Sequence, residues 1–175
     1  SQHLEREVEV LVAQTAGKFR TRHAPRTESQ SCRLDLLEIY CEPDSNLTKV
    51  ITEMGMKAKR FTRQDGDLGT AEGQAKLWEM IHREQPRNIW VAPECKFWGN
   101  FSRWNSGRSP ATAAKIQAGR NQQRVHLELC SDLYWYQVSR GRHFHLEQPQ
   151  GSEATEQPEL DEVVLGTYRT VFDMC

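Results

Sequence analysis

Three short apolar runs, separated by segments of helical periodicity, constrain the fold of this chain most strongly. The runs have the length and the side chains of buried strands: 33–41, 88–93 and 142–147. Helical patterns lie between and after them: 45–55, 71–86, 110–139 and 158–166. Weaker patterns predict strands at 57–62 and 168–174, and loops at 65–70 and 94–109. Strands that alternate with helices predict an α/β domain with a mostly parallel sheet.

The amino-terminal part of the chain differs from this pattern. Residues 3–19 predict an amphipathic helix, and a polar segment with Arg20, Arg22, His23 and Arg26 follows it as a linker. We therefore expect an amino-terminal helix and linker at 1–32 and one α/β domain at 33–175.

Composition excludes several classes of protein. No apolar run is long enough to span a membrane, and we expect no membrane contact. The net charge of −1 means that any nucleic-acid contact needs a local basic patch. The five cysteines are odd in number and form no CxxC pair, which argues against a zinc ribbon or a disulfide framework and favours an intracellular protein.

In parallel sheets, ligands bind beyond the carboxyl ends of the strands. The second strong strand ends just before Cys95, where a thiolate nucleophile would be placed, with Lys96 and Arg103 nearby in the sequence. The alternative is a small residue that fills the end of the strand.

The loop that follows carries four aromatic residues: Phe97, Trp98, Phe101 and Trp104. They either close over the core or form a stacking surface for nucleic-acid bases. The interleaved Arg103 and Arg108 favour the second interpretation slightly.

On the third strong strand, His143, His145 and Glu147 share one face. Two histidines and a carboxylate could bind a metal, although ligands two positions apart lie about 7 Å from each other at their Cα atoms, which strains a three-ligand set. The other interpretations are a single functional Glu147 at the tip of the strand, or ordinary packing.

The first strand leads into a segment without the glycines that cradle a phosphate. Pro43 lies there, and Asp44, Ser45 and Asn46 can cap the next helix.

Taken in order, four segments resemble the amino-terminal half of cytosine-5 DNA methyltransferases. They are LLEIYCEPDSNLTKVITEMGMKAKRF, DGDL, APECKFWGNFS and HFHLEQP, and they cover roughly residues 33–150. The resemblance implies a Rossmann-like fold with S-adenosylmethionine as cofactor and nucleic acid as substrate. The chain is also similar to a domain of retroelement-type polyproteins in dinoflagellate algae, which implies further domains as partners.

The resemblance implies a role for particular residues. Cys95 would attack the cytosine ring, and Glu147 would contact and protonate the flipped base. The remaining residues follow from their place in the motifs: Glu38, Tyr40, Asp44, Ser45 and Asp67 at the cofactor, and Trp98, Ser102 and Arg103 at the substrate.

Three functions stay open on the sequence. The first is a divergent methyltransferase-like domain acting on nucleic acid, which the pairing of Cys95 with Glu147 favours. The second is a non-catalytic module that binds nucleic acid or protein, which the absence of cofactor-loop glycines favours. The third is a metal-dependent hydrolase or nuclease that uses His143, His145 and Glu147.

Overall fold

The computed structural model describes residues 32–171, and its compact unit begins at Cys32. The predicted helix at 3–19, the basic linker after it and residues 172–174 of the last predicted strand lie outside the described residues.

Four parallel strands form one sheet in the order β2, β1, β3, β4. The strands are β1 (Leu34–Ile39), β2 (Ala58–Phe61), β3 (Pro86–Val91) and β4 (His143–Leu146). Leu36 of β1 pairs with Ala58 on one side and Asn88 on the other, and Asn88 is opposite His143. The predicted α/β class with a parallel sheet is confirmed, and the three strong strands are neighbours.

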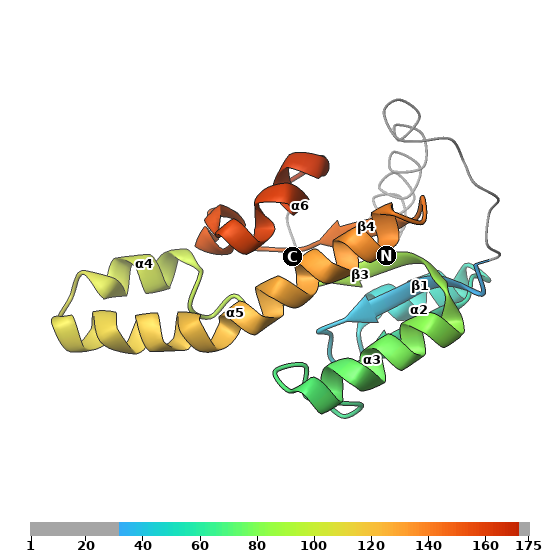
Figure 1. Ribbon diagram of the computed structural model, residues 1–175, viewed down its shortest axis with the longest axis horizontal. Coiled ribbons are helices and arrows are strands. Elements are labelled where there is room, and N and C mark those ends of the chain that lie inside the picture. Colours follow the sequence, from blue (N-terminus) through green and yellow to red (C-terminus); the bar gives the residue numbers. More distant parts are fainter. Residues whose placement is uncertain (1–31, 172–175) are drawn as a thin grey trace. The chain divides into compact units, whose positions relative to one another are not determined.

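One face of the sheet is apolar and is covered by α3 (Ala71–Glu84) and α5 (Pro110–Val138) (Figure 1). Its buried side chains come from three strands and both helices: Leu37, Ile39, Ile89, Val91, Phe144, Leu77, Ile81, Leu129 and Leu133. These residues follow the period of two on each strand and the periodicity of a helix, which is why the elements could be predicted.

The opposite face is covered by α2 (Asn46–Glu53) beside β1 and β2, where Leu36 and Ile51 are buried. Toward β4 this face is polar and half-buried, and it carries Trp90, His143 and His145. The predicted alternation of β4 is confirmed, because Phe144 between the two histidines is buried on the other face.

Hydroxyl side chains start the two longer helices. The Thr70 hydroxyl accepts the backbone N–H of Gly73 at the start of α3, and the Ser109 hydroxyl accepts that of Thr112 at the start of α5. Pro110 follows Ser109 directly, at a position where a helix needs no donor.

Helix α5 is much longer than the strands it covers. Its 29 residues span about 43 Å, whereas a six-residue strand spans about 20 Å. The amino-terminal half of α5 therefore extends beyond the carboxyl ends of the strands, and α4 (Asn100–Ser106) lies beside it (Figure 1). The prediction of an uninterrupted loop at 94–109 was wrong, because α4 forms between Gly99 and Gly107.

The carboxyl-terminal segment packs against α5. It contains two short 3-10 helices, η1 (Glu153–Glu156) and η2 (Pro158–Leu160), and then α6 (Asp161–Gly166). The helix predicted at 158–166 corresponds to η2 and α6, whereas the described part of the last predicted strand, 168–171, forms no strand. None of the helices within residues 32–171 is both long and apolar enough to cross a membrane.

Candidate functional site

Cys95 and Glu147 follow the ends of the neighbouring strands β3 and β4. The backbone N–H of Glu147 donates to the Val91 carbonyl at 2.9 Å, and the Gln148 amide donates to the Pro93 carbonyl at 3.0 Å. The two segments therefore run side by side at the same edge of the sheet, as the sequence predicts.

The side chains of Cys95 and Glu147 have different surroundings. The Glu147 carboxylate accepts the Trp90 indole N–H at 3.0 Å, on the polar face of the sheet. Cys95 is half-buried, and its carbonyl accepts the backbone N–H groups of Trp98 and Gly99, so the residue begins a turn. No hydrogen bond joins the side chains of Cys95 and Glu147 in the described structure.

The two histidines of β4 contact protein groups on the same face. His145 stacks on Trp90 with ring centroids 5.3 Å apart, and its Nε2 lies 3.1 Å from Oδ1 of Asn88. Burial, with His143 nearby, lowers the pKa of His145 to about 4, and burial with Arg87 nearby lowers the pKa of His143. Both rings are therefore neutral at neutral pH.

Among the described residues, no group of three or more His, Cys, Asp or Glu side chains could hold a metal ion. The prediction that His143, His145 and Glu147 could together form a metal-ligand set is therefore wrong. The side chains of His145 and Glu147 instead contact Trp90 and Asn88 on β3.

Glu38 holds the first turn of α2 against β1. Its two carboxylate oxygens accept the hydroxyls of Ser45 and Thr48, each at 2.5 Å, and the residue is only 6% exposed. Both oxygens and the Ser45 hydroxyl thus already have partners within the fold.

The rest of this segment is tied to β2. Arg60 donates to the Pro43 carbonyl and, at 2.8 Å, to the Ser45 carbonyl. Asp44 is exposed. Pro43 has no N–H, so the backbone offers a phosphate or carboxylate fewer donors here than a glycine loop would.

Tyr40 covers the end of β1 and adopts the left-handed region with a φ of 63°. A non-glycine residue there stores about 1 kcal/mol of strain. Its hydroxyl lies 3.0 Å from Nδ1 of His126 on α5, and the two rings meet edge to face. Burial raises the pKa of Tyr40 and lowers that of His126, so this contact joins two neutral groups at neutral pH.

The sequence did not indicate His126, which lies 86 positions from Tyr40. Asp67 and Glu94 lie near enough to oppose the lowering of its pKa. Asp67 is exposed and accepts the backbone N–H of Gly69 at 2.9 Å. With Glu38 and Ser45 engaged, and Tyr40 over the strand end, the residues do not fit S-adenosylmethionine.

A second candidate site lies within residues 95–127, a stretch that we call the basic segment. It contains six cationic residues and no Asp or Glu, in a chain whose net charge is −1: Lys96, Arg103, Arg108, Lys115, Arg120 and Arg124. The sequence alone shows that this stretch has no acidic residue. The sequence-based interpretation as a nucleic-acid surface used only Arg103 and Arg108, which lie among the aromatic residues.

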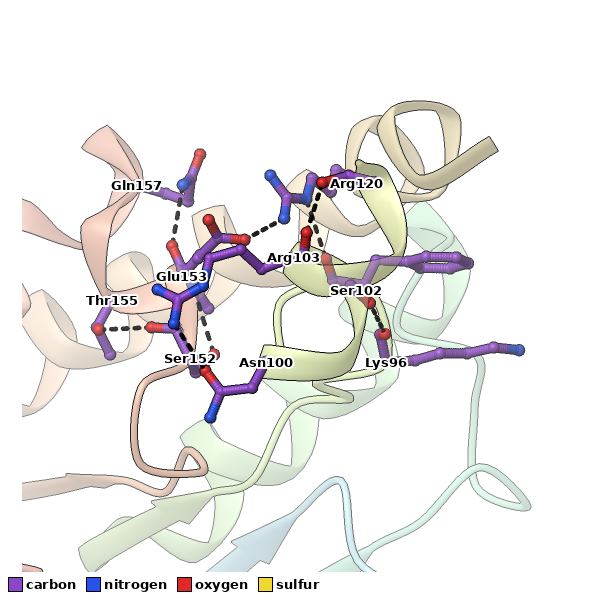
Figure 2. A network of polar contacts seen from close by, with 12 residues as sticks. Lys96, Asn100, Ser102, Arg103, Arg120, Ser152, Glu153, Thr155 and Gln157 are labelled. Atoms are coloured by element: carbon purple, nitrogen blue, oxygen red, sulfur yellow. Dashed lines mark hydrogen bonds and ion pairs between the residues drawn. The ribbon is translucent and has the colours of Figure 1, made fainter. Parts of the chain in front are cut away.

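Two of these cations hold the basic segment to the rest of the fold. Arg120 pairs with Glu153 of η1 (Figure 2) and donates to the Phe97 carbonyl at 2.9 Å. Arg124 pairs with Glu159 of η2. The other four are exposed, and none has an acidic partner within residues 32–171: Lys96, Arg103, Arg108 and Lys115.

The aromatic residues divide into a buried and an exposed group. Trp98 is 1% exposed and stacks against the Arg120 guanidinium, whose central carbon lies 5.2 Å from the ring. Phe97 packs on α5 at Gly119, where a Cβ atom would lie 2.5 Å from the ring. Phe101 and Trp104 on α4 are 76% and 66% exposed. Phe97 and Trp98 therefore pack within the fold, as the first interpretation states, whereas the exposed Phe101 and Trp104 leave the second interpretation open.

Two of the residues assigned to substrate contact need correction. Trp98 is in the core, where it cannot contact a substrate directly. Ser102 is buried as well, and its hydroxyl donates to the Lys96 carbonyl at 2.6 Å (Figure 2). Arg103 remains exposed, with a long 3.5 Å contact to Asn100.

No protein-family model, curated protein or solved structure was found to match the chain.

Proposed function

We propose that this domain binds nucleic acid through its basic segment, and that its methyltransferase-like sheet acts as a scaffold without S-adenosylmethionine. The observation that carries the proposal is the set of four exposed cations beside two exposed aromatic rings, on a stretch with no acidic residue. The resemblance to cytosine-5 DNA methyltransferases supports the same class of ligand.

The charges favour a polyanion. Repulsion among exposed like charges destabilises a fold, and a phosphate backbone relieves it while counterions are released. The histidines of β4 add no charge at neutral pH, because burial lowers their pKa values. We therefore assign the binding surface to the basic segment and not to the histidines of β4.

Replacing the four exposed cations of the basic segment by alanine should weaken binding to a labelled oligonucleotide and flatten its salt dependence. Each lost phosphate contact should reduce the slope of log affinity against log salt by about 0.7 to 0.9. Fluorescence anisotropy over a salt series measures both quantities.

Arg33 and Lys57 provide the matched control, because both are exposed and precede β1 and β2 at the opposite edge of the sheet. Their alanine variants should keep the affinity and the slope of the original chain. Equal losses per charge removed in both sets of variants would show that binding follows overall charge rather than the basic segment, and would contradict the proposal.

The cofactor part of the proposal has its own test. A ligand at about 100 times its dissociation constant adds about 2.7 kcal/mol of stability, which raises the melting temperature by several degrees. We expect S-adenosylmethionine to cause no such shift, because Glu38 and Ser45 bind each other and Tyr40 binds His126.

The methyltransferase alternative has one observation in its favour, which is that Cys95 and Glu147 follow adjacent parallel strands. A saturable rise in melting temperature with S-adenosylmethionine, together with methyl transfer to DNA that Cys95→Ser abolishes, would establish that alternative and refute the scaffold role.

A further inference from the structure

We infer that the ligand of the basic segment is single-stranded nucleic acid, whose unpaired bases stack on Phe101 and Trp104. The inference rests on the proposed function and names its ligand. Its evidence is the geometry of the two rings on α4, which the charge argument does not use.

Phe101 and Trp104 are three positions apart on a helix, so they occupy neighbouring places on one face of α4. Their ring centroids are 5.6 Å apart and their planes are inclined by 80°. Both rings remain largely exposed, although the exposure of their apolar surface to water is unfavourable in free energy. The pair thus presents aromatic surface outward instead of contributing it to the core.

The angle between the rings decides which form of nucleic acid fits. Bases in a duplex lie parallel to one another and expose their flat faces only at the ends. Two bases that stack on rings inclined by 80° must themselves be splayed apart. A flexible single strand can turn its bases in this way, and aromatic stacking on unpaired bases is a usual source of affinity for single strands.

The cations suit the same ligand. Arg103 lies between the two rings in the sequence, Lys96 precedes them and Arg108 follows them, and all three are exposed. Figure 2 shows the Lys96 side chain extending away from the polar contacts that hold Arg120 and Glu153. A backbone that passes these cations would place successive bases within reach of the rings.

The test compares three labelled ligands of about 20 nucleotides with the full chain: a single strand, its duplex, and an abasic strand of the same length. We expect the single strand to bind about 5- to 150-fold more tightly than the abasic strand, and more tightly than the duplex. Phe101→Leu and Trp104→Leu should each remove most of that advantage and leave abasic binding unchanged, because leucine keeps apolar bulk but cannot stack. Tyr168→Leu, at a ring that is 74% exposed outside the segment, is the control and should change nothing.

Each contrary result has a separate meaning. If the abasic strand or the duplex binds as tightly as the single strand, the inference is wrong and the proposed function stands. If none of the three ligands binds, the proposed function fails, and the inference with it. Because both rings are exposed, we expect the leucine variants to keep the melting temperature of the original chain. A loss of binding can then be attributed to the missing rings and not to unfolding.

Discussion

Replacing Trp98 by alanine is expected to lower the free energy of unfolding by about 3–5 kcal/mol, a large share of the stability of a domain of this size. Trp98 is 1% exposed and belongs to the main buried cluster. Its carbonyl accepts the N–H of Glu153 at 2.8 Å, and its ring lies under Arg120. The substitution therefore leaves a cavity where the basic segment joins the carboxyl-terminal segment.

Urea unfolding followed by circular dichroism measures this loss, and Trp104→Ala is the matched control. Trp104 lies six positions further along and is 66% exposed, so its removal should change stability by no more than about 0.5 kcal/mol. Equal effects of the two substitutions would mean that Trp98 is not the residue that joins these segments.

Gly73→Ala is expected to destabilise the fold by about 3 kcal/mol or more, although helix propensity alone would predict a gain of about 1 kcal/mol. A Cβ atom at this position would lie 2.0 Å from the Asp67 carbonyl oxygen. That oxygen accepts both the backbone N–H and the hydroxyl of Thr70, so it cannot move without breaking the start of α3.

Gly107→Ala is the control for this prediction. Its φ is −76°, and the nearest atom to a Cβ there would be 3.8 Å away, so alanine fits without strain. Thermal unfolding of both variants should show a large fall in melting temperature for Gly73→Ala and almost none for Gly107→Ala. A Gly73→Ala variant as stable as the original chain would contradict the close approach of the Asp67 loop to α3.

The fold was largely predictable because each buried strand carries its own local signal. Leu37, Ile39, Ile89 and Val91 lie in short apolar runs whose lengths suit strands and not helices. Helix α4 was missed for an equally local reason: its seven residues are flanked by glycines and include four residues, two Asn and two Ser, that favour turns over helices.

The site was less predictable, because burial and pairing depend on distant parts of the chain. Nothing local distinguishes Trp98 from Trp104, and contacts with distant residues such as Arg120 and Glu153 accompany the burial of the first. Likewise the sequence assigns Ser45 and Glu38 to the cofactor, and only the structure shows that they hydrogen-bond to each other. The charge of the basic segment, by contrast, is a property of the sequence itself.

The order of the strands has a consequence for synthesis. β3 lies between β1 and β4, and about fifty residues separate its end from the start of β4. At about 5 to 20 residues per second, a ribosome needs roughly 3 to 10 seconds to make that interval. During this time the outer edge of β3 has no partner from β4, and an unpaired edge can join another nascent chain. Crowded polysomes are therefore where this domain is most exposed to misassembly.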